Sequence, residues 1–258
     1  MNSAGAVIAL ILLEWTAGWA AGSAWTQSWG VVRRGHFRIT AWLVAALAAL
    51  TFLAFQSLGT HSVAPALLIA VGLAALGYMA AQYFRSDRVG VAAGALLGVL
   101  GLSALGAGAT GIDEWPGLLA ALQLVAGALL LGAVTNGMML GHWYLNQPGL
   151  KPWALERLTT LSLVGVAVSL LAGSVGAGRL LAADTTGAVL GLPGFGQDFG
   201  KIFFVIWIVL MILTATVLWG ARRCVQLRSI QSATGLLYVA LLSAGASDFL
   251  VRYLMVSR

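Results

Sequence analysis

Two carboxylates stand inside long apolar runs of this sequence, Glu14 near its start and Asp248 near its end. Glu14 follows Ile11, Leu12 and Leu13, and no opposite charge is close to it along the chain. An ionisable group at membrane depth is costly, so it is treated first as a functional group. Glu14 is therefore expected to relay protons or to bind the polar head group of a ligand. The alternative is a protonated carboxyl that only hydrogen-bonds to a neighbouring helix.

Asp248 has a residue of opposite charge on its own predicted helix. Arg252 follows four residues later, and residues i and i+4 of an α-helix share a face. We expect the two side chains to pair and Asp248 to be a second proton-handling group. The alternative is an ion pair that only anchors the helix near the membrane surface.

A second group of polar residues lies in two segments that are predicted at the inner membrane face, opposite to the outer face near Asp248. Segment 136–148 ends one apolar run and segment 226–235 begins another, so the two could converge. A quinone needs an apolar slot for its ring and tail and hydrogen-bond donors for its two carbonyls. The alternative is an aromatic belt with helix caps at the membrane surface. The predicted quinone contacts are His142, Tyr144, Asn136, Arg228 and Gln231.

Haem, iron–sulfur clusters and metal sites are not expected in this chain. Bis-histidine ligation of haem needs two histidines at similar depth on facing helices. His36 is predicted in an inner connection, His142 at the inner membrane face and His61 at the outer face, so no pair matches within the membrane. Cys224 is the only cysteine, which excludes an internal disulfide and a cysteine-ligated cluster.

These residues are set in eight apolar segments that fill most of the chain. Hydrophobic residues make up 60% of the 258 residues and charged residues only 9%, a composition that a soluble domain could not keep from water. A membrane-spanning helix needs about 20 mostly apolar residues. The sequence therefore predicts an all-α, polytopic membrane protein, an eight-helix bundle forming one transmembrane domain over 1–258. The spans are predicted near 4–25, 40–58, 63–84, 89–109, 117–140, 158–180, 201–220 and 233–254.

The positive charges predict the orientation of the bundle, because cytoplasmic connections of membrane proteins carry an excess of Lys and Arg. With both termini on the outer face, the outer side keeps only Arg179, Lys201, Arg252 and Arg258. We therefore expect a multi-pass protein of the inner (cytoplasmic) membrane, with lipid rather than nucleic acid around it. The inner connections would then hold Arg33, Arg34, Arg38, Arg85, Arg88, Lys151, Arg157, Arg222, Arg223 and Arg228.

The connections between the predicted spans are short and leave no room for a soluble catalytic domain. The longest are Gly141–Arg157 on the inner side and the glycine-rich Leu181–Gly200 on the outer side. No Lys or Arg precedes Arg33, so the first apolar run is expected to be a retained helix rather than a cleaved signal peptide.

Glycine is abundant within the predicted spans, and two pairs have GxxxG spacing, Gly18 with Gly22 and Gly94 with Gly98. Small residues at this spacing let membrane helices approach closely. We expect these glycines to pack the helices of the bundle, and dimerisation of the chain is the alternative. Each half of the chain holds four predicted spans, but no internal repeat is evident in the sequence.

Two stretches carry a resemblance to a known family. The stretch from Glu14 to Gly22 is rich in small residues, and the last span combines Ala244-Gly245, Asp248 and Arg252 before Tyr253. Both resemble the membrane anchors of polysulfide-reductase and dimethyl-sulfoxide-reductase type complexes, in short patches over roughly a quarter of the chain. In that family an eight-helix anchor binds quinone, and partner subunits carry the iron–sulfur and molybdenum centres. The family's quinone-contacting tyrosine of the fourth span has no counterpart here, because residues 89–109 contain no tyrosine.

The resemblance implies the quinone-interacting anchor of a multi-subunit respiratory oxidoreductase. The chain would then bind quinone and handle protons, and redox subunits would complete the enzyme. Two other functions stay open. One is a small proton-coupled transporter with Glu14 as the coupling group. The other is a non-catalytic scaffold subunit in which the carboxylates only pack helices.

Overall fold

The computed structural model describes residues 4–57, 63–84, 86–112, 115–147, 149–180 and 197–256, without the side chains of residues 4, 177–180 and 197–200. Several residues discussed above therefore lie outside the described part. They are His61, Arg85, Arg258, the side chain of Arg179 and most of the connection Leu181–Gly200.

All secondary structure in the described residues is helical, which confirms the predicted all-α fold. Seven of the helices are long and apolar enough to cross a membrane. The exception is α3, whose 17 residues span about 26 Å at a rise of about 1.5 Å per residue, close to the thickness of a hydrocarbon core of about 30 Å. The helices are α1 (Ala4–Ser28), α2 (Arg34–Ser57), α3 (Pro65–Ala81), α4 (Asp87–Ala109), α5 (Gly117–Asn146), α6 (Trp153–Leu180), α7 (Gln197–Gln226) and α8 (Ile230–Val256).

Several helices extend further than the apolar runs that predict them. Helix α5 continues to Asn146 and α8 begins at Ile230, so His142, Tyr144 and Gln231 are helical. Helix α2 begins at Arg34, which places His36 in its first turn and not in a connection. Hydropathy detects only the part of a helix that lies in hydrocarbon, whereas hydrogen bonding continues the helix through the polar interface.

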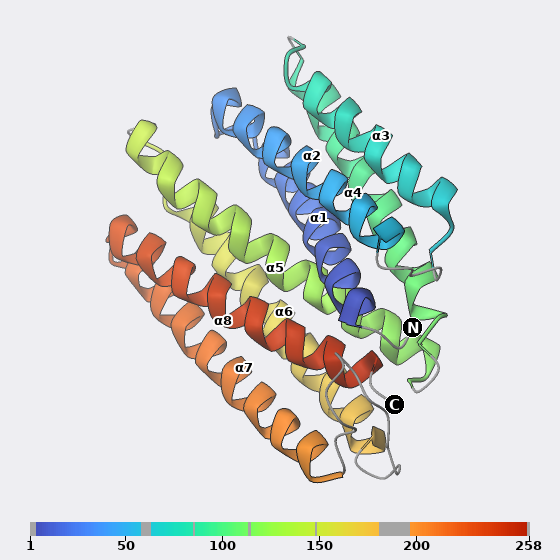
Figure 1. Cartoon of the computed structure of the whole chain (residues 1–258). Coiled ribbons are helices and arrows are strands. Elements are labelled where there is room, and N and C mark those ends of the chain that lie inside the picture. The colour runs from blue at the N-terminus through green and yellow to red at the C-terminus, as the bar shows by residue number, and fades with distance from the viewer. Residues whose placement is uncertain are drawn as a thin grey trace.

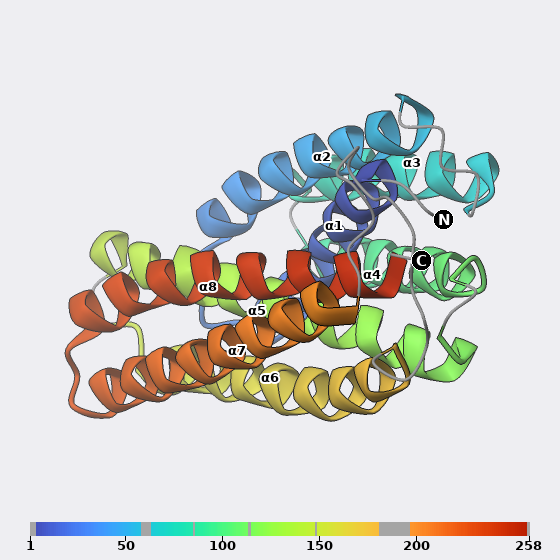
Figure 2. The same cartoon turned by 60° about the horizontal axis from the view of Figure 1, so that its bottom comes forward.

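The eight helices form two four-helix rings of the same connectivity. In the first, α1 packs on α2, α2 on α3, α3 on α4 and α4 on α1; in the second, α5, α6, α7 and α8 do the same. Helices α1 and α5 pack against each other between the rings, and the contacts α1–α8 and α4–α5 correspond in the two halves. Figures 1 and 2 show α2, α3 and α4 on one side of this central pair and α6, α7 and α8 on the other. The structure thus contains a repeat that is not evident in the sequence.

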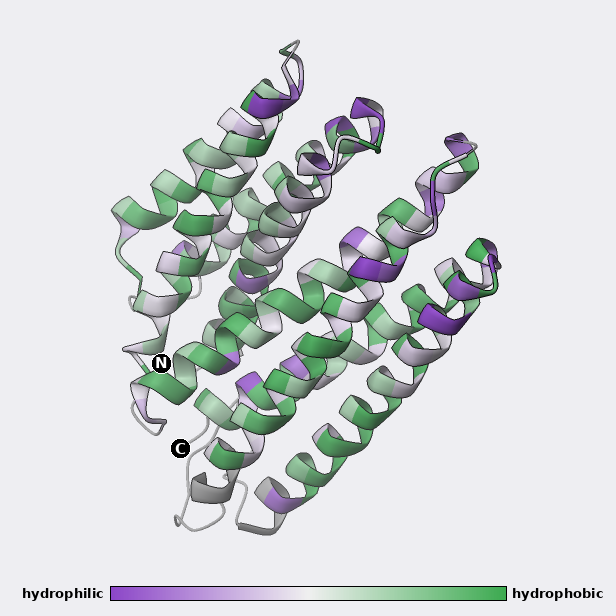
Figure 3. Cartoon of the chain, turned by 180° about the vertical axis from the view of Figure 1, so that it is seen from behind, coloured by the Kyte–Doolittle hydropathy of each residue, from purple (hydrophilic) through white to green (hydrophobic). Residues whose placement is uncertain are grey.

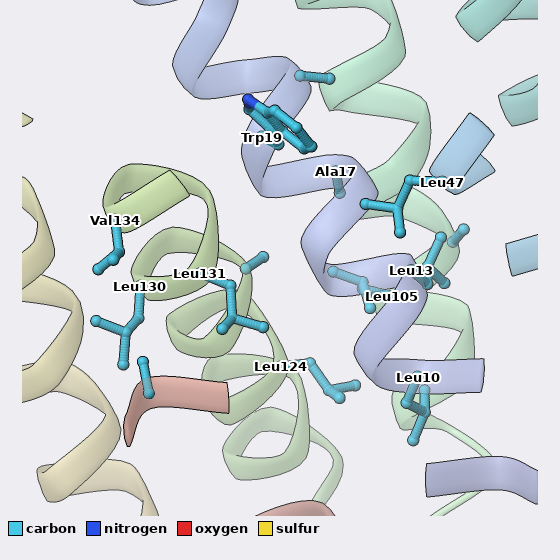
Figure 4. Packing of buried hydrophobic residues seen from close by; sticks show 14 of the residues in the cluster. Leu10, Leu13, Ala17, Trp19, Leu47, Leu105, Leu124, Leu130, Leu131 and Val134 are labelled. Carbon is cyan, nitrogen blue, oxygen red and sulfur yellow. The ribbon is translucent and has the colours of Figure 1, made fainter. Parts of the chain in front are cut away.

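The glycine pairs pack helices within this bundle, as predicted. A Cβ on Gly18 would collide with the backbone of Ala128 in α5, and one on Gly98 would lie 2.9 Å from the Cβ of Ala21 in α1. A Cβ on Gly94 would lie 2.9 Å from the ring of Tyr78 in α3. Around these contacts, leucine side chains of α1, α2, α4 and α5 fill the space between the helices (Figure 4). The central crossing therefore depends on small residues at its closest points.

The outside of the bundle is apolar along the helices and polar at their ends (Figure 3). On α7, Val205, Val209, Ile212 and Trp219 are more than half exposed. A soluble protein rarely shows an apolar surface of this extent, and lipid tails are its natural solvent. The structure therefore supports a polytopic membrane bundle.

Candidate functional site

The two carboxylates predicted to handle protons meet at one arginine between α1 and α8. The Nε of Arg252 donates to Oε1 of Glu14 over 2.5 Å, and its Nη2 donates to Oδ1 of Asp248 over 2.9 Å. The Arg252 and Glu14 side chains are fully buried, and that of Asp248 is 3% exposed. The predicted pairing of Asp248 with Arg252 is confirmed, and Glu14 joins the same cluster.

Helix α5 completes the cluster from a third direction. Nη2 of Arg252 also donates to the backbone carbonyl of Gln123 over 2.9 Å, and Nη1 lies 3.1 Å from the sulfur of Met255. The Gln123 side chain in turn donates to the hydroxyl of Ser169 on α6. All three nitrogens of the guanidinium therefore have partners, which holds its plane fixed between α1, α5 and α8.

The close approach of α5 to this cluster requires a glycine. A Cβ added to Gly127 would collide with Nη2 of Arg252 and would lie 2.6 Å from Oε2 of Glu14 and 2.7 Å from Oδ1 of Asp248. The three charged groups therefore converge on the bare backbone of α5 at Gly127. Any other residue at this position would push the cluster apart.

The charges of the cluster do not balance when both acids are ionised. Two carboxylates face one guanidinium, and a net charge at a site without water is expensive. In the described part of the chain, Oε2 of Glu14 and Oδ2 of Asp248 are buried without a hydrogen-bond partner. A proton on one of these oxygens neutralises the cluster, so the arrangement suits a group that holds a single proton.

The cluster lies toward one end of the bundle. Gln123 is within about two turns of the start of α5 at Gly117, and Arg252 is about one turn from the end of α8 at Val256. Helix α1 starts and α8 ends at this same end of the molecule (Figure 1). On the predicted orientation, which stays a prediction, this is the outer face.

Further polar contacts join α1 to its neighbours toward the opposite end. The indole of Trp15 donates to Thr135 over 2.8 Å, and Thr16 shares a hydrogen bond with Thr51 of α2. Gln27 donates to Gln82 over 3.0 Å. These pairs satisfy polar groups within the bundle and strengthen the packing of α1.

Asn136 belongs to this packing rather than to an open site. Its amide nitrogen donates to the carbonyls of Trp19 and Gly132, and its amide oxygen accepts from Ser23. The side chain is buried at the crossing of α1 and α5. A ligand could reach Asn136 only by replacing these bonds.

The predicted convergence of α5 with α8 at the other end of the bundle is present. The hydroxyl of Tyr238 lies 3.0 Å from Nε2 of His142, and the two rings meet edge to face with centroids 5.4 Å apart. Gly141 directly precedes His142, and a Cβ on it would collide with Thr234, one turn before Tyr238 on α8. The two helices are therefore in close contact here. Both His142 and Tyr238 are exposed on the surface of the bundle.

The other predicted head-group contacts lie near this pair but are not gathered into one pocket. The hydroxyl of Tyr144 donates to the backbone carbonyl of Lys151 over 2.7 Å and holds the connection between α5 and α6. Arg228 adopts a positive φ of 58° in the short turn between α7 and α8. Gln231 is exposed in the first turn of α8, two turns before Tyr238.

Three features of these sites are not predicted from the sequence. Arg252 was assigned to Asp248 alone, although it also binds Glu14, and Gln123 and Tyr238 were not singled out. A signal exists for two of them. A lone buried carboxylate needs a cation, and Arg252 lies within a predicted span, near its outer end. Tyr238 lies one turn after Thr234 and therefore on the same face of its predicted helix.

No family model matches this chain, and no curated protein is similar to it. The described structure is an eight-helix bundle with seven helices of membrane-spanning length.

Proposed function

We propose that this protein is the quinone-interacting membrane anchor of a multi-subunit oxidoreductase, and that Glu14, Asp248 and Arg252 form its proton-handling group. The buried cluster carries the proposal. Quinone reduction takes up protons and quinol oxidation releases them, so a protein that reacts with quinone inside a membrane needs groups that exchange single protons. Two carboxylates that share one guanidinium between three helices supply such a group.

A quinone head group would bind at the other end of the bundle, where His142 and Tyr238 form a hydrogen-bonded pair on the face shared by α5 and α8. Either side chain can donate to a quinone carbonyl, and Leu242, one turn after Tyr238 on α8, is an exposed apolar side chain. Gln231 lies two turns away on α8 as a further donor. Asn136 and Tyr144 are left out of the proposed contacts, because their polar groups are used within the protein. Electron carriers would be supplied by partner subunits.

The experiment that tests this function is purification of the native protein in a mild detergent, with mass spectrometry of the proteins that co-purify. Iron–sulfur or molybdenum subunits, together with quinone-linked electron transfer by the purified complex, are the expected result. A chain that purifies alone and shows no quinone-dependent reaction would overturn the proposal.

The role of the cluster is tested in the same complex with Glu14→Gln. Glutamine keeps an oxygen that can accept the bond from Arg252, so assembly should be unchanged, but it cannot exchange the proton. We expect quinone-linked turnover to fall by about 100-fold. Asp87→Asn, a change in an exposed carboxylate that pairs with Arg34 at the bundle surface, is the matched control and should leave turnover unchanged.

A second function, a small proton-coupled transporter, is favoured by one observation. Transporters often consist of two structural repeats with the coupling site where the repeats meet, and here the cluster joins α1 of one ring to α5 and α8 of the other. The discontinuous helices of many transporters are not present in the described residues. Proton-driven uptake into proteoliposomes by the protein alone, lost in Glu14→Gln, would favour this function over the first.

The third function, a scaffold subunit, predicts a different outcome for the same variants. Glu14→Gln and Asp248→Asn would then change the amount of assembled complex but not the turnover of the complex that forms. Turnover per assembled complex separates this function from the first.

A further inference from the structure

A groove on the outside of the bundle runs from a charged mouth to an apolar interior. The mouth is a hollow of about 440 Å³ between α1, α6 and α7. A second hollow of about 200 Å³ continues from it along the crossing of α1 and α5. Both are lined by Trp25 and Leu161, so the two hollows adjoin, and together they are called the groove below.

Two arginines face a single carboxylate at the mouth. Nη2 of Arg222 lies 3.4 Å from Oε1 of Glu156, and the same oxygen accepts from Gln226. The Nε of Arg222 is buried without a hydrogen-bond partner in the described part of the chain. Arg157 has no carboxylate partner among the described residues and instead stacks over Trp153, 4.5 Å from the ring centre. The mouth therefore has a net positive charge.

Tryptophans frame this mouth. The rings of Trp25 and Trp29 lie 4.8 Å apart, and Trp29 lies 5.3 Å from Trp153. Tryptophan prefers the depth of lipid head groups, where one end of the ring is apolar and the other is wet. The mouth is therefore at the membrane–water interface, on the face where the excess of positive charge is predicted.

The interior of the groove has the opposite character. It is lined by small and aliphatic residues of α1, α4, α5 and α6 and has almost no polar surface. Residues without bulky side chains, such as Gly18, Ala21 and Ala128, line it and leave this space open. Its lining residues include Ala21, Leu102, Val125, Leu129 and Ala133.

We propose that this groove binds an anionic phospholipid, with its phosphate at Arg157 and Arg222 and one acyl chain along the crossing of α1 and α5. Charge complementarity favours an anionic head group, and basic pockets between membrane helices are known sites for such lipids. A quinone would not gain from the two arginines in the same way, because it is uncharged. This inference does not depend on the proposed quinone function.

The test uses the protein in phosphatidylcholine nanodiscs that contain a minor fraction of a lipid with brominated acyl chains. This lipid is phosphatidylglycerol in one preparation and phosphatidylcholine in the other. Bromine quenches tryptophan at short range, and Trp25 lines both parts of the groove. We expect stronger quenching by the brominated phosphatidylglycerol at equal mole fraction. The double variant Arg157→Gln/Arg222→Gln should lose this preference, by about fivefold in relative affinity for each arginine. Trp25→Phe should remove most of the lipid-selective quenching.

Arg223→Gln is the matched control. Arg223 is the neighbour of Arg222 but lines neither hollow; it stacks on Trp219 and donates to Gln226, so the preference should persist. Arg157→Lys/Arg222→Lys keeps both charges and should also keep the preference for phosphatidylglycerol. This variant shows whether a loss in the glutamine variant comes from the lost charges rather than from misfolding. Val125→Phe should narrow the apolar part and weaken quenching by both lipids. Three outcomes would overturn the proposal. The two lipids could quench the wild type equally, or the preference could survive in the double glutamine variant. A short-chain quinone could also displace the lipid with no effect of the arginines.

Discussion

Glu14 and Arg252 are 238 positions apart in the sequence, and their charged groups lie 2.5 Å apart between α1 and α8. This contact closes the bundle, because it joins the first helix of the first ring to the last helix of the second. Asp248 and the Gln123 carbonyl share the same guanidinium. A single arginine therefore connects three helices at the place where the two rings meet.

The first prediction concerns this arginine. Arg252→Met removes the only cation of the cluster and leaves Glu14 and Asp248 buried beside each other. Loss of one partner from a buried ion pair costs about 3–5 kcal/mol, so the detergent-solubilised variant should unfold at a clearly lower temperature than the wild type. Thermal unfolding followed by retention on size-exclusion chromatography measures this.

The matched control for Arg252→Met removes the charges together. Glu14→Gln/Asp248→Asn/Arg252→Met leaves no unpaired charge, so most of the lost stability should return. If Arg252→Met alone unfolds at the wild-type temperature, the cluster does not stabilise the contact between the two rings.

The second prediction concerns the backbone on which the cluster converges. Gly127→Ala places a Cβ against Arg252, Glu14 and Asp248, all within 2.7 Å of that atom. Overpacking of a buried site typically costs about 1–3 kcal/mol, and the variant should unfold at a lower temperature. Gly106→Ala on α4 is the control, because nothing lies within 4 Å of the added Cβ there, and it should be neutral or slightly stabilising. Equal effects of the two variants would show that the cluster can move away from α5.

The sequence was sufficient for the fold class, because long apolar runs leave few alternatives to membrane helices. It was also sufficient for the pair Asp248–Arg252, since the spacing of one helical turn specifies a shared face. The position of Glu14 beside them could not be predicted, because it depends on how α1 packs against α8. No local pattern encodes that contact.

The repeat of two four-helix rings was missed for a similar physical reason. A lipid-facing bundle constrains only hydropathy and the small residues at crossings, so corresponding helices need not share a sequence pattern. Asn136 illustrates the same limit for the site. Its amide type suits a ligand contact, but the structure uses it to join α1 to α5 through Ser23 and the Trp19 carbonyl.

The third prediction concerns the orientation in the membrane. In a Cys224→Ala background, Thr110→Cys places a thiol after the end of α4 and Ser229→Cys places one in the turn before α8, at opposite ends of the bundle. Both native side chains are exposed. If the positive connections are cytoplasmic, a membrane-impermeant maleimide should label Thr110→Cys in intact cells and Ser229→Cys only after permeabilisation. The reverse pattern would place the buried cluster on the cytoplasmic side.

The last prediction concerns the pair His142 and Tyr238, and it separates a ligand contact from a structural one. Tyr238→Phe keeps the edge-to-face ring contact with His142 but removes the hydroxyl. Because both side chains are exposed, the stability of the bundle should change by less than about 0.5 kcal/mol.

If the hydroxyl or the imidazole donates to a quinone carbonyl, both Tyr238→Phe and His142→Ala should raise KM for the quinone by roughly tenfold, the effect of losing about 1.4 kcal/mol of binding. Tyr83→Phe, which removes another exposed hydroxyl that accepts from Trp42 in the other ring, should leave KM unchanged. An unchanged KM in both site variants of a stable, assembled complex would remove this face of α5 and α8 from the quinone site.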